Sequence, residues 1–302
     1  VMKQYGSEIL RLWVAMSDYQ SDLKISDNIL KQNAELYRKI RNTARFLLAN
    51  VSDLGEIVSV DKMGPLDKWV LSKAKSVFDD IQASFEVYEF SKGLNKLNNF
   101  LVVDLSGIYL DVCKDRLYCD DKNDIHRLAS QSAMALIAKK LISTLAPILT
   151  YTMDELLTYA PEFIKQDCAD IFDYTKAELP SIDIYDENDF INDSLLLEAK
   201  EKFSEIKDAL SKEKVIKSTL ELSIYTNSTD ILELGVVEMA DWFLVSKVGR
   251  ISDQESTEYD NFIINGHQFI ICKSIDHKCP RCWKFTVKEE DTLCSRCEQV
   301  IK

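Results

Sequence analysis

The 302-residue sequence contains few of the residues that make tight turns, with only 8 glycines and 5 prolines. This scarcity favours long helices over many short elements. The sequence has three histidines, no Gly-rich phosphate loop and no G-x-S-x-G motif, so the common catalytic signatures are missing. No run approaches the roughly 20 apolar residues of a membrane span, and the N-terminus lacks a signal-peptide pattern. We therefore expect a cytoplasmic, mainly helical protein without a membrane partner.

Positive charge is also in short supply. Lys and Arg number 37 against 50 Asp and Glu, which gives a net charge of −13. Such a surface repels polyanions, which excludes a protein that binds nucleic acid over its whole surface. Nucleic acid would have to bind through local basic patches. Hydrophobic residues make up 46% and charged residues 29%, the profile of a soluble globular protein long enough for two or three domains.

Four cysteines near the C-terminus form two C-x-x-C pairs, Cys279 with Cys282 and Cys294 with Cys297. We expect each pair to form a tight turn and a short ribbon to bring the two turns together. Four thiolates at these spacings predict a closed, structural Zn²⁺ site. The alternatives are two disulfides, which need an oxidising compartment, or a redox pair, which normally opens a helix in a thioredoxin-like unit. The remaining cysteines are scattered and expected to be inert: Cys113, Cys119, Cys168 and Cys272.

The first half of the sequence repeats apolar residues at helical spacing. A short helix over Tyr5–Met16 is followed by an N-cap at Ser26 or Asp27. Pro147 should kink or divide the last helix. Amphipathic helices with short connections predict a helical bundle. The predicted helices are Ile29–Val51, Leu66–Phe90, Leu94–Tyr118 and Asp124–Tyr159.

The second half changes in composition at Pro161. Residues 162–193 contain ten acids and two lysines without a steady period, which predicts an acidic linker. A helix over Leu195–Leu210 should precede a strand over 218–225, with positions 220, 222 and 224 inward and 219, 221 and 223 outward. A helix over 240–245, a strand over 248–251 and a hairpin over 262–272 around Asn265-Gly266 complete a small α+β unit. We predict five segments: a connector helix (1–25), a helical bundle (26–160), an acidic linker (161–193), an α+β domain (194–275) and a zinc-binding ribbon (276–302).

Two local features would suit a polyanion. Arg38, Arg41, Asn42 and Arg45 stand at i, i+3, i+4 and i+7 on one helix face; the alternative is a solvated basic face. Near the cysteines, an exposed Trp283 among cations could stack on an unpaired base, or it could cover the metal site as a hydrophobic lid. The cations around it are Lys278, Arg281, Lys284 and Lys288.

The order of several segments resembles the C-terminal part of bacterial isoleucyl-tRNA synthetases, in the class I aminoacyl-tRNA synthetase family. Tyr5–Trp13 looks like the segment after the family's KMSKS loop, and residues 25–47 resemble the first helix of its anticodon-binding domain. Lys278–Trp283 resembles the terminal zinc module that separates these enzymes from their valine-specific relatives. The other matching segments are Leu66–Trp69, Asp104–Ser106, Tyr109–Asp111, Lys114–Tyr118, Ala146–Leu149 and Asp154–Glu155.

The resemblance implies that the bundle binds the anticodon stem-loop of isoleucine tRNA and that the zinc module holds the same end. No HIGH motif, KMSKS motif or editing domain occurs in these residues, so ATP binding and catalysis are expected elsewhere in a monomeric synthetase, and this chain alone is not expected to be catalytic. The alternative is a helical protein-interaction scaffold with a purely structural zinc ribbon. The residues that the resemblance implies in RNA contact are Arg38, Arg41, Asn42, Arg45, Arg281, Trp283 and Lys284.

Overall fold

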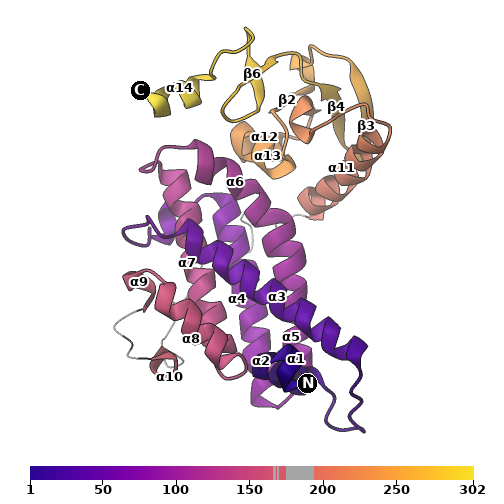
Figure 1. Ribbon diagram of the computed structural model, residues 1–302. Helices are drawn as coiled ribbons and strands as arrows, with labels where there is room; N and C mark the ends of the chain where they lie inside the picture. Colours follow the sequence, from indigo (N-terminus) through magenta and orange to yellow (C-terminus); the bar gives the residue numbers. More distant parts are fainter. Residues whose placement is uncertain (166–167, 169, 175–193) are drawn as a thin grey trace. The chain divides into compact units, whose positions relative to one another are not determined.

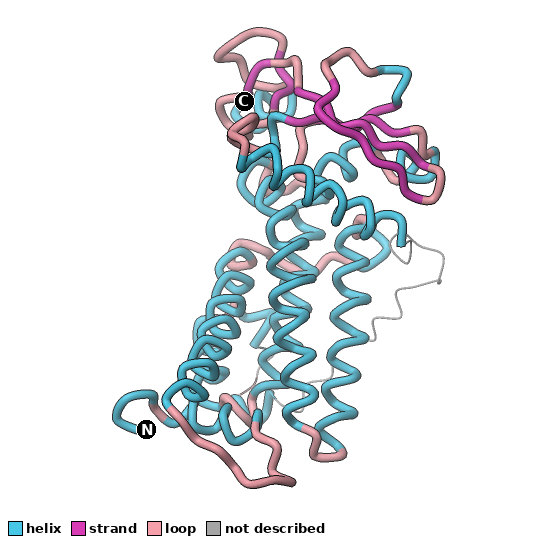
Figure 2. Tube along the Cα trace, turned by 90° about the vertical axis from the view of Figure 1, so that its right-hand side faces the viewer, coloured by secondary structure: helices cyan, strands magenta, loops and turns pink. Residues whose placement is uncertain are grey.

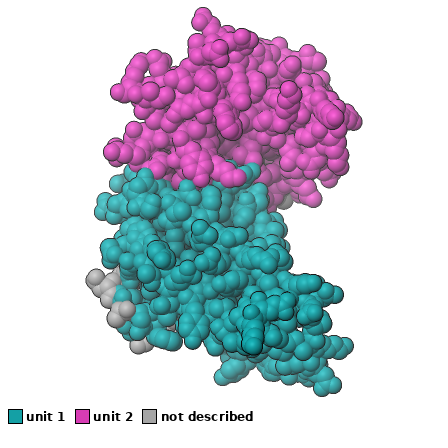
Figure 3. Space-filling model, in the orientation of Figure 1, with its two compact units in different colours: residues 1–111, 128–184 teal, residues 112–127, 185–302 magenta. Residues whose placement is uncertain are grey.

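The computed structural model describes residues 1–165, 168, 170–174 and 194–302. The chain divides into two compact units (Figure 3): unit 1 comprises residues 1–111 and 128–184, and unit 2 comprises residues 112–127 and 185–302. Most of the predicted acidic linker lies outside the described residues. Its described part contains two single-turn helices, α9 (Glu162–Lys165) and α10 (Ile171–Tyr174). No helix among the described residues combines the length and apolar character of a membrane span.

Unit 1 is a bundle of helices (Figures 1 and 2). The Ser26 hydroxyl accepts the N–H of Ile29 at 3.3 Å and caps α3, as the sequence predicts. Pro65 occupies the first turn of α4, where its missing N–H costs nothing. Pro147 separates α7 from α8. The bounds are α1 (Met2–Tyr5), α2 (Ser7–Met16), α3 (Asp27–Asn50), the 3₁₀ turn η1 (Val60–Lys62), α4 (Pro65–Glu86), α5 (Phe90–Asn99), η2 (Phe100–Tyr109), α7 (Ile125–Leu145) and α8 (Thr150–Tyr159).

The predicted third helix extends further than its apolar pattern, from Phe90 to Cys119, as α5, η2 and α6 (Leu110–Cys119). The central stretch, η2, is π-helical, a geometry uncommon in proteins. Its buried Tyr109 donates a hydrogen bond of 2.6 Å to the buried Asp67 carboxylate on α4, and the Ser130 hydroxyl on α7 donates to the same oxygen at 2.9 Å. Two hydrogen bonds to one buried carboxylate therefore join α4, η2 and α7 inside the apolar core.

Unit 2 contains a β-sheet, drawn in magenta in Figure 2. It has four strands in the order β2-β1-β4-β3. β1 pairs in parallel with β2 and antiparallel with β4, and β3 pairs antiparallel with β4. The crossover between β1 and β2 contains α12 and α13, as a parallel pair requires. Asn265 and Gly266 have φ values of 50° and 83°, which confirms the predicted hairpin. The elements are α11 (Ser194–Lys212), η3 (Thr219–Glu221), β1 (Leu222–Thr226), α12 (Thr229–Glu233), α13 (Val236–Phe243), β2 (Lys247–Arg250), η4 (Ile251–Asp253), β3 (Glu258–Ile264) and β4 (His267–Lys273).

The predicted alternation over residues 218–225 is wrong. All five residues of β1 are buried, because this strand lies between two others and the unit covers both of its faces. Ser223, predicted to face outward, shares a hydrogen bond of 2.9 Å with the Ser274 hydroxyl. The helix predicted over 240–245 begins earlier, at Val236, and ends at Phe243, where Leu244 adopts a left-handed φ of 57°.

The C-terminal residues form a two-stranded ribbon and a helix. β5 (His277–Lys278) pairs with β6 (Phe285–Val287), and α14 spans Ser295–Ile301. Only the first C-x-x-C pair lies in a turn of the ribbon. The second pair opens α14, with Cys294 at its N-cap, so the prediction of two equivalent turns is wrong. The surrounding ribbon is not a thioredoxin-like βαβ unit.

Candidate metal centre and nucleic-acid surfaces

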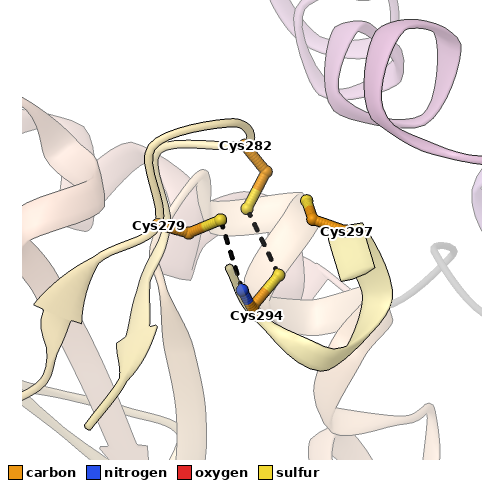
Figure 4. A group of neighbouring side chains, drawn as sticks. All are labelled: Cys279, Cys282, Cys294 and Cys297. Atoms are coloured by element: carbon orange, nitrogen blue, oxygen red, sulfur yellow. Dashed lines mark hydrogen bonds between the residues drawn. The ribbon is translucent and has the colours of Figure 1, made fainter. Parts of the chain in front are cut away.

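The four cysteine sulfurs of the C-terminal ribbon converge on one point (Figure 4). Cys279 and Cys282 approach from the ribbon turn, and Cys294 and Cys297 from the start of α14. Their four Sγ atoms lie within 4.8 Å of one another, and those of Cys282 and Cys294 are 3.7 Å apart. The Cys294 N–H also donates to Cys279 Sγ at 3.4 Å. All four thiols face one another in unit 2.

This arrangement fits a metal ion. A tetrahedral ion with metal–sulfur bonds of about 2.3 Å holds its ligands about 3.8 Å apart, close to the separation of Cys282 and Cys294. Cys279 and Cys297 are fully buried, Cys282 is nearly so, and Cys294 is half-buried. Four thiol donors complete a tetrahedral coordination shell and leave no position for a substrate. The site therefore suits a structural ion rather than a catalytic one.

The acidities of the thiols are consistent with this role. Burial opposes ionisation of Cys279, but backbone N–H groups of Cys282, Cys294 and Arg281 outweigh it and lower the pKa of Cys279 to about 6. Burial raises the pKa of Cys282, and nearby Cys294 and Cys297 raise it further. Burial likewise raises the pKa of Cys297. Four neighbouring thiolates, three of them buried, need a cation to balance their charge, and a bound metal ion would supply it.

A partly buried carboxylate on α6 connects the two cysteine pairs. Asp115 accepts hydrogen bonds from both terminal nitrogens of Arg296, at 2.7 and 2.8 Å, and an ion pair from Lys284 at 3.1 Å. Lys284 follows the first pair by two residues, and Arg296 lies within the second. Burial opposes the charge on Asp115, but the hydrogen bond and charge of Arg296, with the charge of Lys284, lower the pKa of Asp115 to about 2.

Other acids complete this ion-pair network within unit 2. Lys284 Nζ lies 2.6 Å from the buried Asp241 carboxylate on α13, and Arg296 lies 3.1 Å from Asp120. Burial, reinforced by neighbouring acids, outweighs the attraction of Arg296 and raises the pKa of Asp120 to about 6. The sequence carries no local signal for these contacts, because they join residues far apart in the chain.

Cys119, at the end of α6, packs against the cysteine cluster without belonging to it. Arg281 donates hydrogen bonds to the Cys119 carbonyl oxygen and, at 3.4 Å, to Cys297 Sγ. Burial raises the pKa of Cys119 to about 11, so its thiol stays protonated near neutral pH, where the thiolate would be the reactive form. Arg281, predicted to contact RNA, is half-buried and already used within the protein.

Trp283 lies outside the cluster, with 60% of its surface exposed. The backbone N–H of Trp283 donates to the Cys279 carbonyl oxygen at 3.0 Å, and its φ is 67°, a left-handed conformation that is unusual for a bulky residue. Lys278 Nζ lies 5.0 Å from the ring centroid. The geometry shows an exposed ring beside a cation rather than a lid over the sulfurs.

Lys284, also predicted to contact RNA, is much less exposed than the neighbouring Trp283. Its side chain is only 14% exposed and both of its ion pairs are internal. These ion pairs hold the ribbon against α6 and α13. The sequence shows Lys284 only as a cation next to an exposed tryptophan, because its partners Asp115 and Asp241 are distant in the chain.

The arginine face of α3 forms as the spacing predicts. Arg38, Asn42 and Arg45 are exposed, while Leu30, Ile40 and Leu47 lie buried on the opposite side. Arg38 pairs with Glu35 on the same helix. Arg41 lies at the margin, where it bonds the Glu155 carboxylate of α8 at 3.0 and 3.2 Å. We call the exposed stripe of Lys31, Arg38, Asn42 and Arg45, with Arg41 at its edge, the α3 basic face.

Comparison with known proteins places the chain in a family. A family model for the anticodon-binding domain of tRNA ligases matches residues 67–232, more than half of the chain. The chain belongs to the anticodon-binding domain family of tRNA ligases. The cysteine cluster and the α3 basic face lie outside the range that this model matches.

Relatives match the chain over its whole length. The isoleucine–tRNA ligase of Aliarcobacter butzleri is 74% identical over 302 residues, that of Nitratiruptor sp. 56% over 301 residues, and that of Sulfurimonas denitrificans 52% over 301 residues. Each alignment covers 100% of this chain and 32% of the relative. The chain therefore spans about a third of the length of these relatives.

Removing one thiol should empty the metal centre. We expect one tightly bound ion per chain, measured by elemental mass spectrometry, and its loss in Cys297→Ser, because a hydroxyl is a poorer ligand than a thiolate. Cys168→Ser changes a half-buried cysteine outside the cluster and should keep the ion. Two disulfides in the metal-free, fully folded protein would contradict a metal centre.

Asp115→Asn should destabilise unit 2 by about 2 kcal/mol, since it takes the shared carboxylate from two partly buried cations that keep Asp241 and Asp120 as partners. Because the folded-state pKa of Asp115 is depressed, its contribution to stability is present above the ordinary carboxyl pKa near 4 and is lost as the pH falls toward 2. The difference in free energy of unfolding between wild type and variant should therefore be constant from pH 7 to 5 and shrink below pH 4.

Asp79→Asn is the matched control for this prediction. It removes a carboxylate from an exposed ion pair with Lys75, which should cost less than about 1 kcal/mol. Urea unfolding at several pH values measures both variants. Equal stabilities for Asp115→Asn and Asp79→Asn would show that the network does not hold the ribbon.

Proposed function

We propose that the chain is the anticodon-recognition part of an isoleucine–tRNA ligase. The observation that carries this proposal is the match of its full length to isoleucine–tRNA ligases at 52 to 74% identity, together with the anticodon-binding family model. ATP-dependent attachment of isoleucine is the proposed activity of the whole, monomeric ligase. This chain contributes binding and positioning, so that the acceptor end of the tRNA reaches a catalytic domain elsewhere in that protein.

The two units contribute different RNA-binding chemistry. On the α3 basic face, Arg38, Arg41 and Arg45 bind phosphate oxygens and Asn42 bonds a base or sugar edge. On the ribbon of unit 2, Trp283 stacks on an unpaired base while Lys278 holds a neighbouring phosphate. Phosphate contacts set the register of the RNA, and stacking with hydrogen bonds discriminates between anticodon bases.

Zinc is the ion that we propose for the cysteine cluster. Cys279, Cys282, Cys294 and Cys297 would hold it, because four soft thiolates in a closed tetrahedron are the donor set of structural zinc sites. The bound ion supplies the positive charge that keeps these four thiolates together, and with them the turn that presents Trp283. Zinc takes no part in the chemistry of aminoacylation in this proposal.

Selective binding of tRNA tests the proposal against the alternative of a protein-interaction scaffold. In the whole ligase, Trp283→Ala should weaken binding of isoleucine tRNA by about fivefold or more, the lower bound for losing one base stack, while the bound metal stays at one equivalent. Gel shifts with isoleucine tRNA and with an unrelated tRNA give the affinity and its selectivity, and elemental analysis gives the metal content.

Tyr118→Ala is the control for Trp283→Ala, because Tyr118 belongs to the same unit and is also 60% exposed. It should bind tRNA like wild type. Loss of the metal in Trp283→Ala, or an unchanged affinity, would remove the stacking role. Equal affinity of the wild type for both tRNAs would favour the scaffold.

The salt dependence of binding tests the α3 basic face. Arg45→Gln should weaken tRNA binding and reduce the log–log salt slope by about 0.7 to 0.9, the contribution of one phosphate contact. Lys92→Gln, an equal charge change at an exposed cation of α5, should leave the slope as it is. An identical slope in Arg45→Gln and wild type would take this helix out of the interface.

A further inference from the structure

α8 lies beside the α3 basic face, and the two helices run in the same direction at their contact. The Tyr37 hydroxyl hydrogen-bonds the Thr152 hydroxyl at 2.9 Å, and one turn further along each helix Arg41 bonds Glu155 at 3.0 Å. Successive turns of α8 therefore lie beside successive turns of α3. Arg45 stands one more turn along α3, and Tyr159 one more turn along α8.

Two tyrosines of α8 flank this contact. Tyr151 and Tyr159 stand four residues before and four residues after Glu155, so helical spacing places all three within about 80° of arc on one side of α8. Tyr151 is 72% exposed and Tyr159 is 79% exposed, the highest values among the large hydrophobic side chains that the structure describes. Both rings therefore offer an accessible π-face on which an unpaired base could stack.

The charges around these tyrosines suit an anion. Arg41 and Arg45 of the α3 basic face stand on the side of α3 toward α8 and supply the cations, in a protein whose net charge is −13. The acids beside these tyrosines are Asp154 and Glu155 on α8 and Glu162 on α9, and two of them already form ion pairs, Glu155 with Arg41 and Glu162 with Lys165. Exposed aromatic rings next to cations match the chemistry of single-stranded nucleic acid, whose bases stack and whose phosphates carry charge.

We propose that Tyr151 and Tyr159 form a base-stacking platform for unpaired nucleotides of the tRNA anticodon loop. The inference rests on the proposed function and adds a stacking element to the phosphate contacts of α3. Eight residues of helix separate the two rings by about 12 Å along the axis, a span that a few unpaired nucleotides cover. Their bases lie on the rings while Arg45 and Arg41 hold the backbone.

Alanine and phenylalanine variants of both tyrosines test this platform in the whole ligase. Tyr151→Ala and Tyr159→Ala should each weaken isoleucine tRNA binding by about fivefold or more, since one stacked base contributes roughly 1–3 kcal/mol. Tyr151→Phe and Tyr159→Phe keep the ring and should bind within about twofold of wild type. Because stacking releases no counterions, the salt slope should stay at the wild-type value in all four variants.

The control Tyr19→Ala removes another exposed ring of unit 1, which is 57% exposed and follows α2, and should bind like wild type. Thermal unfolding verifies that each variant is folded. Equal weakening by Ala and Phe would overturn stacking in favour of the hydroxyl groups. Wild-type affinity in both Ala variants, with altered oligomeric state by light scattering, would show a protein-docking surface and overturn the platform.

The failures of the inference and of the proposed function can be told apart. If Arg45→Gln and Trp283→Ala weaken tRNA binding but the Ala variants of Tyr151 and Tyr159 do not, the platform is wrong and the proposed function stands. If none of these variants changes tRNA binding, the anticodon-recognition role of these surfaces fails together with the platform.

Discussion

The shared carboxylate of Asp115 is the contact on which the architecture around the cysteine cluster depends. It binds Lys284, which follows the first C-x-x-C pair, and Arg296, which lies inside the second. Two features therefore bring the cysteine pairs together. Their four sulfurs converge on one point, and one acid on α6 binds a residue next to the first pair and a residue within the second. Removing this acid is costly, because it takes the shared carboxylate from two partly buried cations and leaves Lys284 with Asp241 and Arg296 with Asp120. The constraint also fixes the chain on either side of Trp283, since Cys282 and Lys284 are both anchored while the ring between them stays in solvent.

An acidic protein can bind a polyanion only where it locally reverses its charge, and the bundle does so on one helix. α3 buries its apolar side in the bundle and exposes Arg38, Asn42 and Arg45 on the other. The charge of Glu155, an acid of α8 beside this stripe, is balanced by its ion pair with Arg41. Stacking groups add affinity without adding charge, so Trp283 and the α8 tyrosines complement the cations. In this account recognition is distributed over several modest contacts rather than one deep pocket.

The features that the sequence predicts well are those encoded locally. Cysteine spacing identifies the cluster, Ser26 and Pro65 identify helix starts, and Asn265-Gly266 identifies a hairpin turn. The errors arise where long-range contacts decide. The internal ion pairs of Lys284 are not predicted, because its partners, Asp115 and Asp241, lie far from it in the chain. The alternating pattern predicts that Ser223 faces solvent, but β1 is a central strand and Ser223 is buried. The residues of a strand do not indicate whether it lies at the centre or the edge of a sheet. The sequence carries no signal that singles out Tyr151 and Tyr159, because the exposure of a helix face depends on what packs against it.

The central claim is that these surfaces contact the anticodon loop of a tRNA, and cross-linking tests it most directly. Isoleucine tRNA carrying a photoreactive base at an anticodon position would be bound to the whole ligase and irradiated, and the attached peptides identified by mass spectrometry. The account predicts cross-links to peptides that contain α3 or α8 of unit 1 and to the ribbon peptide around Trp283. Cross-links confined to other parts of the ligase, with these peptides unmodified at saturating tRNA, would contradict it.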